Sequence, residues 1–208
     1  MRISLGKTVR LVSVMVTVTA SLGACASTRP ASPSAEPTLS VRPPVPDGWS
    51  TIASDEGDVR LVIPPGATIM QTAGSVLAQG PFRDGAVPWE AWATGPRALI
   101  DQPRAGQSIA DWLGQSGWMP QAGEGITQGP TTERELILPA GRALEVTTSL
   151  QLGTPDEGRA IIYAIETGGG LAILRFVGTP AILEERALDL QLMSQLVEFG
   201  NQPEQSNP

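Results

Sequence analysis

Three consecutive segments in the second half of the chain have the patterns of neighbouring β-strands, and they limit the folds that the chain can adopt. From residue 144 to residue 152, apolar residues alternate with polar ones, which is typical of a strand with one face in water. Residues 160–166 and 171–177 follow after turns rich in glycine and polar residues. Both segments are apolar at nearly every position, as in central strands covered on two sides. An antiparallel three-stranded meander is therefore predicted.

Shorter strand patterns and one short helix pattern come before the meander. Ser108 and Asp111 have a spacing that resembles a capping box, so a helix is expected to begin there and to end at Gly114 or Gly117. Strands are expected in four further places, at residues 49–53, 59–63, 87–94 and 136–138.

A long helix is predicted at the end of the domain, over residues 180–199. Thr179 can cap this helix, and Pro180 suits its first position. The order of the elements predicts an α+β fold in which helices flank an antiparallel β-sheet, an α/β/α sandwich. The apolar side of the last helix is expected to cover one face of the sheet and includes Leu183, Leu188, Leu192, Met193, Leu196 and Phe199.

The N-terminal segment that ends at Cys25 has the pattern of a bacterial lipoprotein signal. Three basic residues precede an apolar stretch at residues 11–20, which is too short to span a bilayer, since a spanning helix needs about 20 apolar residues. Leu22-Gly23-Ala24-Cys25 then resembles the bacterial lipobox. We expect residues 1–24 to be a signal peptide and the Cys25 thiol to carry diacylglycerol, with acyl chains such as palmitate anchoring the protein. The alternative is an ordinary cleaved signal with a cysteine there by chance.

The sequence after Cys25 divides into a stalk, a domain and a tail. Residues 25–46 comprise the lipidated cysteine and a stretch rich in proline, serine and alanine, which is expected to be an extended stalk. Residues 47–199 are expected to form one domain, and residues 200–208 a disordered tail. This organisation predicts a protein on the extracytoplasmic face of the cell membrane. Ala26 in place of aspartate after the cysteine implies the outer membrane in a cell that has one.

Composition restricts the chemistry open to the domain. The chain has no histidine, one cysteine and one lysine, Lys7, which lies in the signal peptide. Histidine triads, histidine-dependent metal sites, thiol nucleophiles and lysine Schiff bases are therefore excluded, and neither a metal nor a cofactor is expected. After residue 24 the chain has 11 arginines and 21 acidic residues, a formal charge of −10, so nucleic acid is not an expected partner. Hydrolysis by paired carboxylates remains formally open.

Four tryptophans are the candidate contact residues for a ligand or a partner protein. They are Trp89, Trp92, Trp112 and Trp118. Tryptophan is common at the centre of interfaces. In a regular strand Trp89 and Trp92 would point to opposite faces, so both cannot fill one core. The alternative role for each of the four is packing between a helix and the sheet.

The layout of the domain resembles a known family. The features that carry the resemblance are Gly48-Trp49, residues 59–64, the capped helix at Ser108, residues 138–145, the two closing strands and the terminal helix. Together they resemble the PsbP-like family, which includes photosystem extrinsic proteins and bacterial lipoproteins of the LpqN type. The resemblance covers residues 47–199 and implies an antiparallel sheet flanked by helices and a role in binding or assembly. The histidines linked to metal in photosystem members have no counterpart here.

These features predict a non-catalytic binding or assembly module of the cell envelope, anchored by lipid at Cys25 and acting on an envelope protein that the sequence does not identify. One alternative is a carrier or sensor that holds a small apolar ligand between sheet and helix. A less favoured alternative is a carboxylate-based hydrolase of envelope polymers.

Overall fold

The computed structural model describes residues 42–81, 88–99, 101–119, 127–151 and 157–200. All of them belong to one structural unit that spans residues 37–208. The predicted signal peptide, Cys25 and most of the predicted stalk lie outside the described residues. Within the described residues, no helix has the length and apolar character that crossing a membrane requires.

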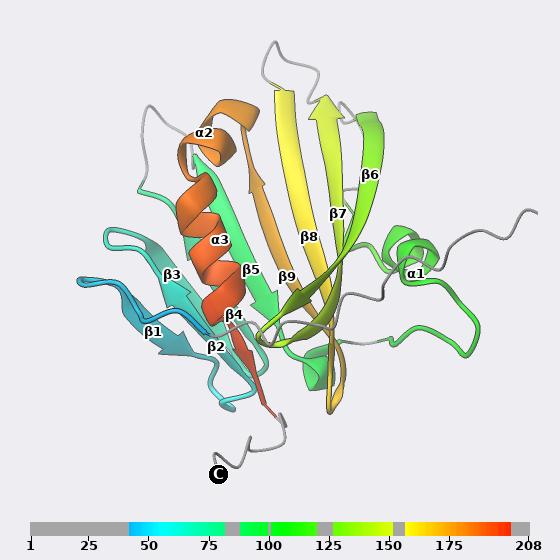
Figure 1. The fold of residues 1–208 in the computed structure, drawn as a ribbon, viewed down its shortest axis with the longest axis horizontal. Coiled ribbons are helices and arrows are strands. Elements are labelled where there is room, and N and C mark those ends of the chain that lie inside the picture. The colour runs from blue at the N-terminus through cyan, green and yellow to red at the C-terminus, as the bar shows by residue number, and fades with distance from the viewer. Residues whose placement is uncertain (1–41, 82–87, 100, 120–126, 152–156, 201–208) are drawn as a thin grey trace, which may run out of the picture. The chain divides into compact units, whose positions relative to one another are not determined.

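A seven-stranded antiparallel sheet forms the centre of this unit (Figure 1). Its strand order is β3-β4-β5-β9-β8-β7-β6. The predicted meander is confirmed, because β8 pairs with β7 on one side and with β9 on the other. The strands are β3 (Thr68–Thr72), β4 (Ser75–Gln79), β5 (Trp89–Thr94), β6 (Thr127–Leu138), β7 (Gly141–Gln151), β8 (Glu157–Thr167) and β9 (Gly170–Gly178).

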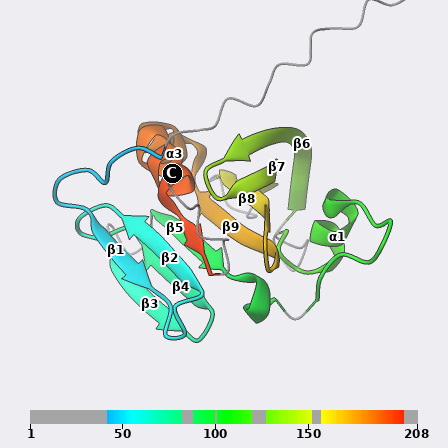
Figure 2. The same ribbon diagram turned by 60° about the horizontal axis from the view of Figure 1, so that its bottom comes forward.

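A smaller sheet of three strands packs beside the large one. Its order is β1-β2-β10, and both pairs of strands are antiparallel. Strand β2 lies next to β4 and to the last helix (Figure 2). The strands are β1 (Ser50–Ala53), β2 (Val59–Ile63) and β10 (Glu198–Phe199).

The described helices are short, and two of them begin as predicted. Ser108 Oγ accepts a hydrogen bond from the Asp111 backbone N–H at 3.1 Å, which caps α1. Thr179 Oγ1 accepts from the Ile182 backbone N–H at 3.4 Å and caps α2, with Pro180 at its first position. The helices are η1 (Pro96–Ala98), α1 (Ile109–Gln115), α2 (Pro180–Glu185) and α3 (Ala187–Leu196).

The prediction of one continuous helix over residues 180–199 is wrong. Arg186, with φ −97° and ψ 12°, separates α2 from α3, and the extended Val197 ends α3 so that the chain can pair with β2 as β10. Leu183, Leu190 and Val197 are buried at a spacing of seven residues, whereas Leu188, expected on the apolar side, is 75% exposed.

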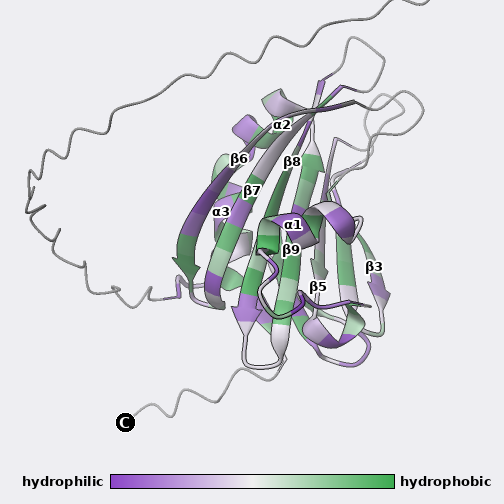
Figure 3. Ribbon diagram, turned by 90° about the vertical axis from the view of Figure 1, so that its right-hand side faces the viewer, coloured by the Kyte–Doolittle hydropathy of each residue, from purple (hydrophilic) through white to green (hydrophobic). Residues whose placement is uncertain are grey.

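The two faces of the large sheet carry separate cores. One face packs against α2, α3 and the small sheet, with Leu174 and Phe176 of β9 among its buried side chains. The opposite face packs against α1 through Trp112 and Leu113. The fold is therefore α+β, as predicted, with few and short helices in the described part of the chain. The sheets dominate, because α1 has only seven residues and covers only part of its face (Figure 3).

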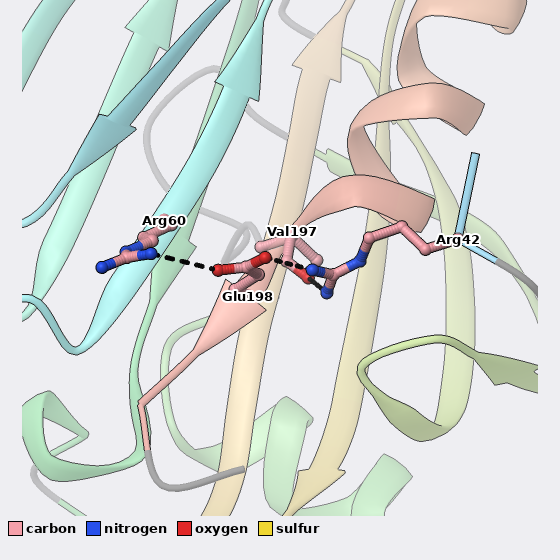
Figure 4. A network of polar contacts seen from close by, with 4 residues as sticks. All are labelled: Arg42, Arg60, Val197 and Glu198. Carbon is pink, nitrogen blue, oxygen red and sulfur yellow. Dashed lines mark hydrogen bonds and ion pairs between the residues drawn. The ribbon is translucent and has the colours of Figure 1, made fainter. Parts of the chain in front are cut away.

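Arg42, the first described residue, contacts the small sheet (Figure 4). The Arg42 guanidinium forms an ion pair with Glu198 on β10 and donates a hydrogen bond to the Val197 carbonyl at 3.4 Å. Arg60 on β2 approaches the second Glu198 carboxylate oxygen at 3.7 Å. The part of the predicted stalk around Arg42 therefore lies against the domain.

Candidate binding site

The structure separates the four tryptophans into two pairs. Trp89 is 5% exposed and belongs to the core beneath α2 and α3, and Trp112 is 3% exposed and belongs to the core beneath α1. Trp92 and Trp118 are half-buried and meet on the α1 side of the sheet, with ring centroids 5.8 Å apart and an edge-to-face angle of 76°. Of the four, only Trp92 and Trp118 are partly available to a partner.

Arg175 completes a cluster with these two rings. It is the direct neighbour of Trp92 in the pairing of β5 with β9, and its guanidinium carbon lies 5.3 Å from the centroid of the Trp92 ring. Its Nη1 donates a hydrogen bond to the Trp118 carbonyl at 3.4 Å. The cation–π contact and this hydrogen bond tie the segment after α1 to the middle of the sheet.

Burial is the main influence on the charge of Arg175. It lowers the pKa of the guanidinium, and the Glu90 carboxylate on β5 acts in the opposite direction. Glu90 itself accepts a hydrogen bond from Gln79 Nε2 at 2.7 Å. The buried Arg175 Nε has no hydrogen-bond partner in the described part of the chain. The two tryptophan rings and Arg175 thus hold the segment after α1 against the sheet. They offer no nucleophile and no proton donor suited to catalysis at neutral pH.

A second feature lies beside α1, where the helix leaves β6 and β7 uncovered. An open cavity of about 650 Å³ separates the start of α1 from these two strands, and we name it the α1 groove. Figure 3 looks onto this face of the sheet, with α1 in front and β6 and β7 to one side of it. The groove is lined by residues of three regions, namely Gln107, Ser108, Ile109 and Ala110 at α1, Glu133, Glu135, Leu136 and Ile137 on β6, and Arg142, Ala143, Leu144 and Glu166 on β7 and β8.

The side chains of the groove combine an apolar floor with an acidic rim. Ile137 is 51% exposed, so a large apolar side chain is accessible in the groove. Glu133, Glu135 and Glu166 supply three exposed carboxylates. Arg142 is the single cation among the described residues that line the groove, and its guanidinium lies 4.0 Å from Glu135. The groove therefore has an excess of negative charge around an exposed apolar side chain.

Local backbone chemistry explains why the groove is open. Helix α1 ends at Gln115, and Gly117 has a φ of +77°, which suits glycine and turns the chain away before the helix can extend. At the other end, Gly141 closes the β6–β7 hairpin with a φ of +149°. A Cβ atom on Gly141 would collide with the Glu166 carbonyl oxygen, so only glycine allows β7 to start this close to β8.

Sequence reasoning missed Arg175 and the α1 groove. Arg175 is the single charged residue between residues 171 and 177, and a charge inside an otherwise apolar central strand could have indicated it. The groove was missed because only residues 136–138 of β6 were expected as a strand. The signal was present as the alternation of Glu133, Glu135 and Ile137, which the strand places on one face.

No group of three or more histidine, cysteine, aspartate or glutamate residues in the described part of the chain is arranged to hold a metal ion. Cys25, the predicted lipid attachment site, lies outside the described residues.

No protein-family model and no curated protein sequence matches the chain. Solved structures with a similar fold include the Ran-binding protein Mog1p of Saccharomyces cerevisiae, with 10% identity over 72% of this chain and 94% of that chain and a TM-score of 0.48. They also include the cyanobacterial PsbP (CyanoP) of Synechocystis sp. PCC 6803, with 6% identity over 73% and 92% of the two chains and a TM-score of 0.49. A Pseudomonas aeruginosa protein of unknown function, PA94, has 14% identity over 71% and 94% and a TM-score of 0.43.

One of these similar structures is a PsbP protein. The TM-scores and the sequence identities of all three are low.

Proposed function

We propose that this chain is a lipid-anchored protein of the extracytoplasmic face of the cell membrane, and that its domain, of PsbP-like α/β/α layout, is a non-catalytic binding or assembly module. The spacing of Leu22-Gly23-Ala24-Cys25 supports the anchor. The open α1 groove carries the proposal of binding. An exposed apolar centre with a polar rim is the usual anatomy of a protein interface.

The carboxylates in the groove support binding better than hydrolysis. A carboxylate pair that catalyses hydrolysis needs two different environments, one of which desolvates the acid so that it stays protonated. Glu133 and Glu135 are both exposed, and the Glu135 side chain is 83% exposed. They share one solvated environment on the same strand, which suits attraction of a cation.

A carrier of a small apolar ligand is the second candidate. The groove volume of about 650 Å³ falls within the range of small-molecule pockets, which is roughly 300–1,000 Å³. Small-molecule sites, however, enclose most of the ligand surface, whereas this groove is open along one side. Its shape therefore favours a protein segment.

The anchor is tested by Cys25→Ser in the full chain. The variant is expected to leave the membrane fraction and to lose incorporation of an alkyne-labelled palmitate. Ser27→Ala, which retains the cysteine, is the control and is expected to behave like the wild type. A wild-type protein that takes up no label would overturn the anchor.

The binding role is tested by placing a photo-crosslinking amino acid at Ile137 in the groove or at Leu188 on α3. Both positions are exposed apolar side chains, at 51% and 75%, and they lie on opposite faces of the sheet. A protein adduct is expected from position 137 and none from position 188. Equal adducts from both positions, or none from either, would contradict a binding role for the groove. A small-molecule adduct at position 137 would favour the carrier.

A further inference from the structure

The charged side chains of the α1 groove form a line along one strand. Glu133, Glu135 and Ile137 lie on the same face of β6, opposite Val146, Leu144 and Arg142 of β7 in the strand pairing. Alternate residues of a strand are about 7 Å apart. Two carboxylates and one apolar side chain therefore follow each other at the spacing of alternate residues in any extended peptide.

We infer that the α1 groove binds an extended basic peptide segment of a partner protein, in which two arginine or lysine side chains and one apolar side chain occupy alternate positions. The inference rests on the proposed binding function of the groove. The basic side chains would face Glu133 and Glu135, and the apolar side chain would cover Ile137.

Charge complementarity selects this occupant. The groove lining carries the carboxylates of Glu133, Glu135 and Glu166 and the guanidinium of Arg142. The contact between Arg142 and Glu135 is long, at 4.0 Å, and their side chains are 73% and 83% exposed, so an incoming cation can replace it readily. Anionic peptides and nucleic acids would meet an excess of negative charge.

The wall of the groove does not oppose a cation. A helix N-terminus ordinarily carries partial positive charge, and α1 begins at this wall. Here the Ser108 hydroxyl donates a hydrogen bond to the Asp111 carboxylate at 2.6 Å, while Ser108 Oγ accepts from the Asp111 backbone N–H. The carboxylate of Asp111 therefore offsets the positive end of the helix.

A second copy of the chain fits the groove poorly. After the signal peptide the chain has 11 arginines against 21 acidic residues and no lysine, so two copies repel each other overall. The stretch with two basic residues and one apolar residue at alternate positions is therefore expected in another protein.

The test is selection of peptides from a random heptapeptide display library on the full chain purified in detergent. Enriched peptides are expected to contain two arginine or lysine residues and one leucine, isoleucine or valine at alternate positions. A synthetic copy of the most enriched peptide, labelled with fluorescein, then gives the Kd by fluorescence anisotropy. The Kd is expected to rise at least about fivefold when sodium chloride is raised from about 50 to about 500 mM, because exposed charge pairs are screened.

Two matched glutamine variants and one variant of the apolar side chain localise the binding. The combined substitution Glu133→Gln, Glu135→Gln and Glu166→Gln is expected to weaken the peptide about tenfold or more, and Ile137→Thr several-fold. The combination Glu56→Gln, Glu184→Gln and Glu185→Gln removes the same charge at exposed positions outside the groove and is expected to change the Kd less than twofold. All six glutamates are exposed, so the variants are expected to fold, which a thermal melt checks.

Enrichment of acidic peptides, or equal loss of affinity in both glutamine variants, would overturn the basic partner. Enrichment of purely apolar peptides whose binding is lost in Ile137→Thr would overturn it as well but would leave the groove a binding site. If no peptide is enriched, the inference fails, and the absence of a crosslink from position 137 would show that the proposed binding function fails with it.

Discussion

Two glycines beside the α1 groove, Gly141 and Gly114, differ in the space that the methyl group of an alanine substitution would have. A Cβ on Gly141 would collide with the Glu166 carbonyl, and its φ of +149° is strained for other residues. A Cβ on Gly114, inside α1, would have no heavy atom within 4 Å. Gly141→Ala is expected to lower the free energy of unfolding by about 1–3 kcal/mol from backbone strain alone, with the collision adding to that loss. Gly114→Ala is expected to raise it by about 0.5–1 kcal/mol, because alanine favours helix.

Urea unfolding of the two variants beside the wild type measures both effects. An unchanged or raised free energy of unfolding in Gly141→Ala would show that the hairpin can relax around residue 141, and the close approach of β7 to β8 would then not depend on glycine.

The single tyrosine provides a probe of the buried face. Tyr163 is 9% exposed and packs edge-on against Phe176 at 6.0 Å. Burial, and after it the neighbouring Glu145 carboxylate, raises the pKa of Tyr163 well above its ordinary value. In the unfolded chain the tyrosine side chain ionises at about pH 10, so the stability that comes from neutral Tyr163 is complete below that pH. It is lost as the pH rises from there toward the higher pKa of the folded state.

Because the chain has one tyrosine, the absorbance of tyrosinate follows this residue alone. Below the pH at which the protein unfolds, little tyrosinate is expected, and Tyr163→Phe is expected to lose less stability than the wild type above about pH 10. If Tyr163 titrated at about pH 10 in the folded protein, that result would contradict its burial.

The candidate residues show what residue type alone can predict. Tryptophan indicated contact positions, but the sequence could not tell which rings would be enclosed. Trp89 lies in the core beneath α2 and α3, which are distant from it in the sequence. Trp112 is part of α1 and packs against sheet strands that are likewise distant in the sequence. Arg175 contacts the Trp92 ring on β5 and the Trp118 carbonyl, and both residues lie far from it in the sequence, so its place in the cluster could not be predicted.

Elements with local signals were predicted, whereas elements made by distant pairing were not. The alternation in β7 and the caps at Ser108 and Thr179 depend on residues close in the sequence, so they could be recognised. Strand β3 is exposed at all five positions, and its two apolar residues, Ile69 and Met70, are adjacent, so its sequence has no alternation to detect. Strand β10 exists because Glu198 and Phe199 pair with β2, which lies near the start of the domain.

The break between α2 and α3 gives a matched pair of leucines at the scale of one helix. Leu190 is 5% exposed and lies in the core beneath the helices, and Leu188 is 75% exposed. Leu190→Ala is expected to lower the free energy of unfolding by about 2–5 kcal/mol, because it leaves a cavity. Leu188→Ala is expected to change it by less than about 0.5 kcal/mol.

Chemical denaturation of both variants tests which of the two leucines the core encloses. With the apolar side predicted from the sequence, Leu188 would be buried and its substitution would be the costly one. Equal losses would show that the helical register around Arg186 differs from the structure.

For the whole molecule, the first described residues are attached to the domain on the side of the sheet away from the groove. Arg42 contacts Glu198 and the Val197 carbonyl, next to the end of α3 (Figure 4). Helix α3 covers one face of the large sheet, and the α1 groove opens on the other. The contacts of Arg42 and the α1 groove are therefore on opposite faces of the large sheet.

The attachment of Arg42 can be tested without disturbing the core. The Arg42 and Glu198 side chains are 35% and 39% exposed, so Arg42→Ala is expected to change the free energy of unfolding by less than about 1 kcal/mol. Amide hydrogen exchange in residues 42–49 is nevertheless expected to accelerate, because the segment loses both its ion pair and its hydrogen bond to Val197. Arg60→Ala is the control, since Arg60 lies on β2 and approaches Glu198 only at 3.7 Å. It is expected to leave exchange in residues 42–49 unchanged. Wild-type exchange in this segment as fast as in Arg42→Ala would mean that the contacts of Arg42 with Glu198 and Val197 do not hold the segment in solution.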